Sequence, residues 1–577
     1  MRKGDGTLLS SVTPPPLAPN GFLQTRLDDA GTFPGVAGTT DTGLWLEFTA
    51  DQPVLAFASV IHNVSGDPFA VVAVRDGGGS CPPGFSGPDC SFCTWNSAGA
   101  ACQARSPRDL IDLAAIKNLT LAELGWTPKS TVKVNGVTIY TGDWSGGVFP
   151  TYDKQDKPVD LTLREAAALY VPDGYPATAH PDLGFVYAAH YPANLDSATA
   201  VTLARYFGMP VLYHGEYPNW RDAGYTDRNE ILSASFPILM RANPCLPSDL
   251  VRGYFPLALA KTDMRAITLL QRLAERLGGN VKKVALDGFS KEGQGAWLAF
   301  QMDDRIEVGI PGGAPMEDRL AWQQFLVAAT GCEAGASFLN IQALEDLSFW
   351  QKTTPSGAAY LNLYSVGSGN LPLLYPRMLL INGDVGMYNM HDGSYGMGPG
   401  GETAFLDSLA GRSWRYVRKA TVEPGAGGED GDTTSTTAVP ILGAELLVSG
   451  PGSERTLYPD ILSANANLTG NSLVVTATAS SVTQSARVWW TWSTDRVFTE
   501  ETQEPWKSVS MTTTGGGVWT SPAIAVPAGT VIAWYAEVGN SVTVGAASYG
   551  RNHAAPIRFL RPTPDRQCTP TPVTYCD

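Results

Sequence analysis

The chain has 577 residues, which is too many for one hydrophobic core and predicts about two to four domains. Its 40 Lys and Arg residues face 55 Asp and Glu residues, which gives a net charge of −15. This charge repels phosphate backbones and anionic bilayers, so the composition excludes nucleic-acid binding and polybasic docking to lipid. No apolar run approaches the roughly 18 residues of a membrane-spanning helix.

The N-terminal part predicts strands. Over residues 1–78, runs such as GLWLEFTA and FAVVAV alternate apolar and polar residues between turns rich in Asp, Gly and Pro, which indicates a partial β-sandwich. The first residues, MRKGDGTLLSSV, lack the apolar core of a secretory leader. We nevertheless expect a secreted or extracellular protein, because Lys is scarce and the cysteines are clustered. A truncated N-terminus would explain the missing leader.

The cysteines indicate disulfides. Their even number and local clustering are typical of bridges formed outside the cytosol. The alternative is a zinc site, but CPPGFSGPDCSFC has no second CxxC pair and no nearby His. Residues 79–105 therefore predict a Cys-rich, EGF-like linker or a plain disulfide-stapled linker, and residues 561–577 predict a tail closed by one disulfide. The eight cysteines are Cys81, Cys90, Cys93, Cys102, Cys245, Cys332, Cys568 and Cys576.

Residues 106–424 predict an α/β domain. Short apolar strands such as GFVYAAHYP, PVLYHGEYP and RMLLINGD end in polar or Gly-containing turns, and runs such as KTDMRAITLLQRLAERL have helical spacing. Alternating strands and helices predict a mostly parallel sheet with helices on both faces.

The C-terminal part predicts a second all-β module. Residues 425–444 begin with GAGGEDGDTTSTTA and are expected to form a polar linker, because this stretch has nothing to bury. Runs such as ARVWWTWST and VIAWYAEVG then predict an Ig-like β-sandwich over residues 445–560. On the first run, Trp490 and Trp492 share one face and Trp489 lies on the other, so one face is core and the other could stack on a sugar or a partner.

The stretch VKKVALDGFSKEGQG is the most informative part of the sequence. It predicts a strand, a sharp turn around Ser290 and a helix, with Gly288 two residues before the serine and Gly293 three after it. Such a turn exposes a nucleophile above the carboxyl edge of a parallel sheet, and its glycines let the strand and helix approach closely. The helix N-terminus and the Lys291 N–H then point toward a developing oxyanion. The alternative is a structural serine in a strand-to-helix turn.

Three further segments supply candidate partners of the nucleophile. The backbone after GFVYAAHYP, near His190 and Tyr191, predicts the second oxyanion N–H. Asp384 ends RMLLINGD and predicts the acid that orients a base. His391 is the one histidine that follows Ser290 within this domain, and it predicts the base. A solvated surface histidine is the alternative.

The same residues resemble the PhoPQ-activated pathogenicity-related family, a secreted α/β-hydrolase-like group that includes an autocrine proliferation repressor. GFSKEGQGAW is similar to the family's GASKRGWTTW-type elbow. DDRIEVGIPG, LLINGDVGMYNMHDGS and VWWTWSTDRVF resemble three later segments, and the similarity runs from about residue 196 to about residue 420 and into the C-terminal sandwich. The matched elbow positions are Gly288, Ser290, Lys291, Gly293 and Trp297.

The resemblance implies an α/β-hydrolase-like domain flanked by β-sandwich modules, with Ser290 as nucleophile and Asp384, or Asp392, as acid. It does not carry over the base. The family places a histidine in a Pro-Asn-Ala-Gly-His turn after the last strand, and this chain has ATVEPGAGG there.

Two functions follow. The first is a secreted serine hydrolase that cleaves carboxylic esters or amides of a small molecule or polymer. The second is a non-catalytic binding or adhesion protein on a lapsed hydrolase fold, with a carbohydrate or a cell surface as its partner. No cofactor is expected, because no Gly-rich phosphate loop is present, and no metal, because GEDGD lacks EF-hand spacing.

Overall fold

The computed structural model describes parts of the chain that form two compact units, Met1–Asp76 and Gly77–Asp577. In the first unit, the antiparallel strands β1 (Phe57–Ile61) and β2 (Pro68–Val72) are described. The partial sandwich over residues 1–78 stays a prediction, and all eight cysteines lie outside the described residues. The described residues are 57–61, 68–72, 110–154, 157–189, 197–216, 224, 255–289, 291–312, 378–383, 415–420, 433–494, 507–555 and 558–560.

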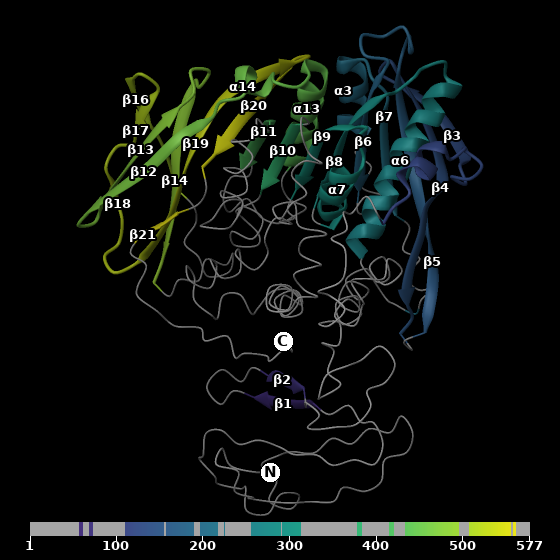
Figure 1. The fold of residues 1–577 in the computed structure, drawn as a ribbon. Coiled ribbons are helices and arrows are strands. Elements are labelled where there is room, and N and C mark those ends of the chain that lie inside the picture. Colours follow the sequence, from purple (N-terminus) through teal and green to yellow (C-terminus); the bar gives the residue numbers. More distant parts are fainter. Residues whose placement is uncertain are drawn as a thin grey trace, which may run out of the picture. The chain divides into compact units, whose positions relative to one another are not determined.

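A nine-stranded mixed sheet forms the centre of the second unit, in the order β11-β10-β9-β8-β6-β7-β5-β4-β3 (Figure 1). The six strands from β11 to β7 are parallel, whereas β5 is antiparallel to β7 and continues into the antiparallel strands β4 and β3. The order reverses once, because β6 lies between β7 and β8. The strands are β3 (Thr127–Val134), β4 (Val137–Tyr152), β5 (Pro158–Pro172), β6 (Leu183–Ala189), β7 (Val211–Glu216), β8 (Lys283–Phe289), β9 (Ile306–Gly312), β10 (Met378–Gly383) and β11 (Arg415–Ala420).

Helices cover both faces of this sheet, as the alternating pattern predicts. α6 (Phe255–Arg276), α7 (Lys291–Met302) and the short α2 (Leu113–Asn118) share one hydrophobic core with the sheet. α3 (Ser197–Phe207) and α13 (Thr433–Ser449) share the other. The strand period of two divides β8 between them, since Leu286 belongs to the first core and Ala285 to the second.

The predicted polar linker over residues 425–444 is wrong from residue 433 onward, where α13 begins. The apolar run AVPILGAELLV decides this segment, because Ile441 and Leu446 are fully buried against the sheet. Burying such side chains is worth about 2 kcal/mol each, which outweighs the poor helix propensity of the preceding Thr and Ser residues. The α/β domain therefore extends beyond residue 424.

Two five-stranded sheets follow α13 and the short α14 (Glu454–Leu457). Their inner faces meet in a third core that includes Val475, Val488 and Trp534, so the all-β module that the sequence predicts is confirmed. One sheet holds β12 (Ile461–Thr469), β13 (Ser472–Ala479), β16 (Thr512–Gly515), β17 (Val518–Thr520) and β18 (Ile524–Ala525). The other holds β14 (Ser485–Ser493), β15 (Lys507–Ser510), β19 (Val531–Val544), β20 (Ala547–Ala554) and β21 (Arg558–Leu560).

The tryptophans of β14 divide between the two faces, as the strand period predicts. Trp490 packs against the sandwich core. Trp489 lies on the other face, where it is 6% exposed and stacks on Tyr535 of β19 at 6.3 Å between ring centroids. Because Trp489 is covered, it does not offer the exposed ring that stacking on a sugar requires.

A buried ion pair joins the sandwich to α13. Arg551 of β20 pairs with Glu445, and its Nε donates to a carboxylate oxygen of that residue at 2.9 Å. The hydroxyl of Tyr458 donates to the same carboxylate at 3.2 Å. The helix thus contributes apolar residues to the α/β domain and a carboxylate to the module that follows.

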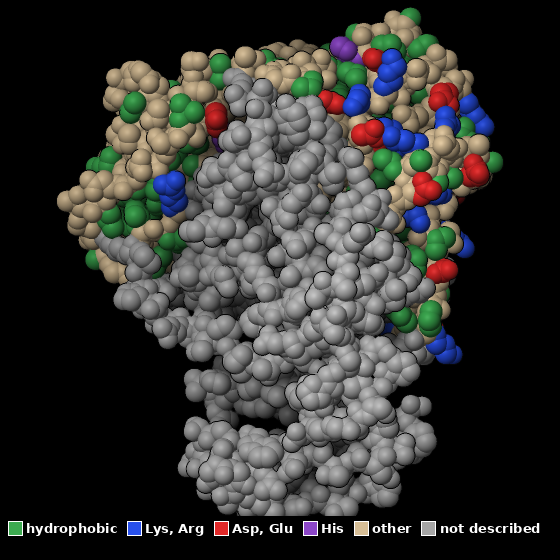
Figure 2. All heavy atoms as spheres, viewed as in Figure 1, with side chains coloured by type: hydrophobic (Ala, Val, Ile, Leu, Met, Phe, Trp, Pro, Cys, Tyr) green, Lys and Arg blue, Asp and Glu red, His purple; other side chains and the backbone are tan. Residues whose placement is uncertain are grey.

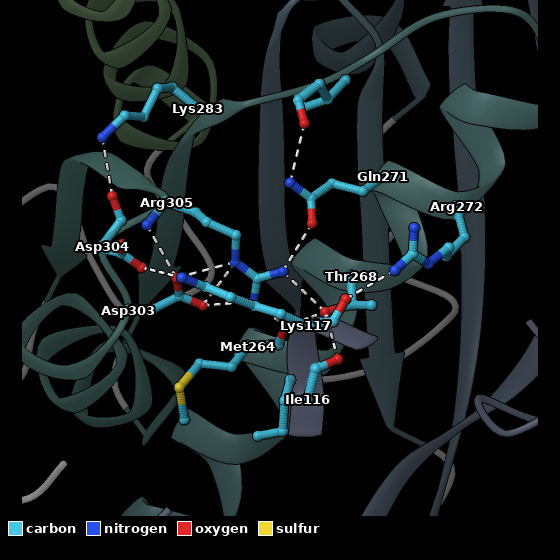
Figure 3. A network of polar contacts seen from close by, with 11 residues as sticks. Ile116, Lys117, Met264, Thr268, Gln271, Arg272, Lys283, Asp303, Asp304 and Arg305 are labelled. Atoms are coloured by element: carbon cyan, nitrogen blue, oxygen red, sulfur yellow. Dashed lines mark hydrogen bonds and ion pairs between the residues drawn. The ribbon is translucent and has the colours of Figure 1, made fainter. Parts of the chain in front are cut away.

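A second buried ion pair fixes the amino end of β9 to α6 (Figure 3). Arg305 pairs with Asp303 and donates to the Met264 carbonyl, the Thr268 hydroxyl and the Gln271 amide oxygen. The last three of these bonds join the start of β9 to α6, so this network stabilises the amino edge of the sheet.

Charged side chains of both signs are mixed on the surface around β3 to β5 (Figure 2). Lys129 pairs with Asp143, and Lys133 pairs with Asp173. Exposed pairs of this kind contribute little stability, but their alternation leaves no field of one sign on this face. Of the helices that the structure describes, none is long and apolar enough to cross a membrane.

Candidate active site

The sharp turn that the sequence predicts lies between β8 and α7. β8 ends at Phe289 and α7 begins at Lys291, so a single residue separates a central parallel strand from a helix. That residue is Ser290, which itself lies outside the described residues. A strand that passes into a helix within one residue places the connecting residue at the carboxyl edge of the sheet, as a nucleophile elbow requires.

Two glycines let the elements around this turn approach closely. A Cβ on Gly288 would lie 2.6 Å from the carbonyl oxygen of Glu292, so a larger residue there would displace the strand or the helix. A Cβ on Gly295 would lie 2.7 Å from the Cβ of Leu259, which shows that α7 packs tightly on α6. Gly293 is buried. The glycine requirement therefore extends from the predicted elbow into the helix that follows it.

The other predicted site residues follow strands of the same parallel set. Tyr191 comes two residues after the end of β6, and Asp384 comes directly after β10. Lys291 is the first residue of α7. Because the carboxyl ends of parallel strands share one edge of a sheet, these segments start from the same edge as the elbow. Tyr191, Asp384 and His391 lie outside the described residues, so their roles stay predictions.

Asp287 is a buried acid that the sequence reasoning missed. It precedes Gly288 on β8, is 5% exposed, and lies opposite Tyr187 of β6 and Ile310 of β9. Burial raises the pKa of its carboxyl to about 8. At neutral pH the group is therefore mostly a neutral acid, which adds no negative charge close to the turn. Its signal in the sequence is a lone acid in the apolar strand VALDGF.

A second missed group is a histidine enclosed by two carboxylates. The Nδ1 atom of His214 on β7 lies 3.5 Å from Glu165 on β5, and its Nε2 atom lies 3.3 Å from Asp263 on α6. All three side chains are at most 4% exposed, and the ring meets Trp144 edge to face at 5.7 Å. The only sequence signal was a histidine in the apolar strand PVLYHGE.

The charges in this cluster depend on one another. Burial alone would lower the pKa of His214, but the carboxylates of Asp263 and Glu165 together outweigh it and raise the value to about 9. The pKa of Asp263 is raised to about 6, because burial and Glu165 oppose the charged form more than the His214 imidazolium favours it. Near neutral pH the cluster therefore holds a cation between acids.

His214 is not placed to act as a base for Ser290. In the sheet it lies level with Ala188 of β6, which lies level with Gly288 of β8, so two strand spacings of about 4.8 Å separate it from the elbow strand. A base must come within about 3 Å of the nucleophile. Both ring nitrogens of His214 already face carboxylates. A histidine base for Ser290 would therefore have to come from another position.

Comparisons with known proteins bear on the fold only weakly. No protein-family model matches the chain, and no curated protein matches it. The fold is instead identified from the strand order and from the turn between β8 and α7. The domain has the α/β-hydrolase fold. Within the described ranges, no group of three His, Cys, Asp or Glu side chains is arranged to hold a metal ion.

Solved structures that are similar to this chain include several esterases. Acetyl xylan esterase 1 from a Thermoanaerobacterium species matches at 11% identity with a TM-score of 0.33, covering 60% of this chain and 95% of its own. An acetyl xylan esterase from a Paenibacillus species matches at 13% identity with a TM-score of 0.34, covering 60% of this chain and 98% of its own. A glucuronoyl esterase from Solibacter usitatus matches at 13% identity with a TM-score of 0.29, covering 54% of this chain and 87% of its own.

Proposed function

We propose that the protein is a secreted serine hydrolase that cleaves carboxylic esters or amides, with Ser290 as its nucleophile. The observation that carries this proposal is the connection of β8 to α7 through residue 290 alone, with Gly288 packed against Glu292. This local geometry is what an exposed nucleophile at a sheet edge needs. The similarity to the PhoPQ-activated group, which the sequence suggests, is part of the same proposal.

In the proposed reaction the Ser290 hydroxyl attacks the carbonyl carbon while His391 accepts its proton. The carbonyl electron pair moves to oxygen, which the backbone N–H groups of Lys291 and Tyr191 stabilise. Collapse of this intermediate expels the alcohol or amine, which takes the proton back from His391. Water then attacks the acyl-serine by the same route and releases the acid. Asp384 orients the imidazole throughout.

Helix α7 supports the oxyanion in this scheme. The first N–H groups of a helix have no partner within it, and Lys291 is the first residue of α7. Their dipoles add a partial positive charge at this end. The neutral carboxyl of Asp287 preserves that field, because an ionised acid three residues before Ser290 would oppose a negative intermediate.

The second function, binding without catalysis, is favoured by one observation. The segment after β11 reads TVEPGAGGED and holds no histidine, although a hydrolase of this fold commonly places its base there. The covered ring of Trp489 removes one of the surfaces on which a sugar could stack. Binding therefore becomes the favoured function only if the elbow proves inert.

Labelling with a fluorophosphonate probe tests the proposed function directly. We expect the folded protein to form a covalent adduct on Ser290, located by mass spectrometry of the peptide that spans β8 and α7. Ser290→Ala should remove the adduct, and Gln294→Ala, which changes the same helix away from the turn, should retain it. Absence of labelling in folded protein, or labelling that survives Ser290→Ala, would contradict the proposal.

A further inference from the structure

We propose that His214 is a positioning residue of this site: held between Glu165 and Asp263, it fixes α6 to the sheet and thereby sets the position of α7 behind the elbow. This inference rests on the proposed function for its catalytic consequence. Its structural part, that the cluster holds α7 in place, is independent of any activity.

The cluster joins three elements that are far apart in the sequence. Glu165 comes from β5, His214 from β7 and Asp263 from the middle of α6. Nitrogen-to-oxygen distances of 3.5 and 3.3 Å place the ring within ion-pair range of both acids. Removing one partner of a buried pair leaves an uncompensated charge, which is far more costly than losing an exposed pair. The histidine therefore acts as a cross-link between the sheet and α6.

The other charged groups near this cluster belong to α6 and α7. Arg265 donates to the Ser145 carbonyl at 3.2 Å, and its stem and that of Lys261 lie against Gly147 on β4. Their charges are therefore directed toward β4, while the buried Glu292 lies in the first turn of α7. The His214 ring is the cation that lies between the two acids of the cluster.

Asp263 connects the cluster to the elbow helix. A Cβ on Gly295 of α7 would lie 3.1 Å from the Asp263 carboxylate, so the carboxylate lies close to α7 at a position without a side chain. Gly295 lies little more than one helical turn after the residue that connects β8 to α7. If His214 loses its charge, the two carboxylates face each other across the gap, and Asp263 must move or take up a proton. Either change alters the surface on which α7 rests.

The Arg305 network supplies a matched control. It is also a buried ion pair that binds α6, at the amino end of β9 (Figure 3). Because β8 and β9 are parallel, this end lies at the opposite edge of the sheet from the elbow. A variant such as Asp303→Asn disturbs a similar buried ion pair to the same helix, from a residue that follows α7 and precedes β9. Effects shared by both clusters report general destabilisation, and effects confined to the His214 cluster report positioning.

Hydrogen–deuterium exchange of the whole chain, followed by mass spectrometry, tests the structural part. We expect His214→Gln to raise exchange in the first turns of α7 about tenfold or more. We expect Asp303→Asn to raise it at the start of β9 instead. Asp263→Asn, which keeps the shape of the side chain, should likewise raise exchange in the first turns of α7. It replaces His214→Gln in the test if that variant does not fold. The inference would be overturned if His214→Gln and Asp303→Asn raised exchange in α7 equally, or if neither raised it above that of the wild type.

Ester hydrolysis tests the catalytic part. We expect kcat of His214→Gln to fall about tenfold or more with KM within about twofold, because an interaction made chiefly in the transition state is disturbed. Asp303→Asn should keep the kcat of the wild type, even where it lowers Tm as much as His214→Gln does. If wild type is inactive, the proposed function fails, and the exchange pattern still decides whether the cluster holds α7. If wild type is active and both variants lose kcat alike, the positioning role is wrong.

Discussion

The backbone of Gly288 lies so close to Glu292 that a Cβ on the glycine would be 2.6 Å from the glutamate's carbonyl oxygen. The strand before the turn and the first helical turn after it therefore touch through a position where no side chain fits. This contact makes the passage from β8 to α7 within one residue sterically feasible.

Gly288→Ala should damage the site and the stability together. The added methyl group must displace the strand or the helix, which costs about 1–3 kcal/mol by analogy with overpacked cores. We expect a lower Tm and loss of most fluorophosphonate labelling. Gln294→Ala is the control, because it alters α7 without adding an atom to the contact. Full labelling of Gly288→Ala would show that the close approach is not required.

Asp287 should make stability depend on pH. Its pKa is raised by burial from an ordinary 3.8 to about 8, so between these values the folded chain holds a proton that the unfolded chain has released. The free energy of unfolding then falls as pH rises, by at most about 1.4 kcal/mol per pH unit. Asp287→Asn should flatten this slope in urea titrations between about pH 5 and about pH 7.5. An unchanged slope would contradict the buried neutral acid.

His214 should also make stability fall as pH rises, but at higher pH than Asp287 does. Burial opposes its charge, but Asp263 and Glu165 raise its pKa from 6.5 to about 9. The folded chain therefore keeps this proton after the unfolded chain has lost it, so its stabilising contribution is complete below about pH 6.5 and lost as pH rises through about 9. His214→Gln should be less stable than wild type at neutral pH, and the difference should shrink above pH 9. A difference that is constant with pH would contradict a charged ring.

Glu445 and Arg551 should matter more than an exposed pair does. Their side chains are 9% and 12% exposed, so Glu445→Gln weakens a largely desolvated ion pair between α13 and β20. We expect a loss of about 1–3 kcal/mol in the free energy of unfolding. Arg487→Gln is the control, because Arg487 is 46% exposed where it pairs with Glu537, and it should change stability by less than about 1 kcal/mol. Equal losses would show that burial does not govern this contact.

Local patterns in the sequence predicted much of the fold. Apolar strands that alternate with amphipathic helices predict the mixed sheet, and the spacing of Gly288, Ser290 and Gly293 predicts the turn between β8 and α7. These features depend on neighbouring residues, which a reader of the sequence can see. The helix α13 was missed because polar Thr and Ser residues precede its apolar part and Pro440 lies inside it.

The His214 cluster could not be predicted in the same way. Its three residues come from positions 165, 214 and 263, and only the crossing of β5, β7 and α6 brings them together. Asp287 needed the burial of a whole strand to identify its raised pKa. The predicted site still consists of Ser290, Lys291, Tyr191, Asp384 and His391. Of this site, the structure describes the backbone of Lys291, where α7 begins.

Hydrolysis of short-chain p-nitrophenyl esters by wild type, Ser290→Ala and His391→Ala tests the central claim most directly. We predict that the wild type is active and that each substitution lowers kcat about a thousandfold or more, because nucleophile and base act as one unit. Asp303→Asn serves as the folded control. A folded but inactive wild type, or a Ser290→Ala variant that retains activity, would contradict a serine hydrolase centred on this turn.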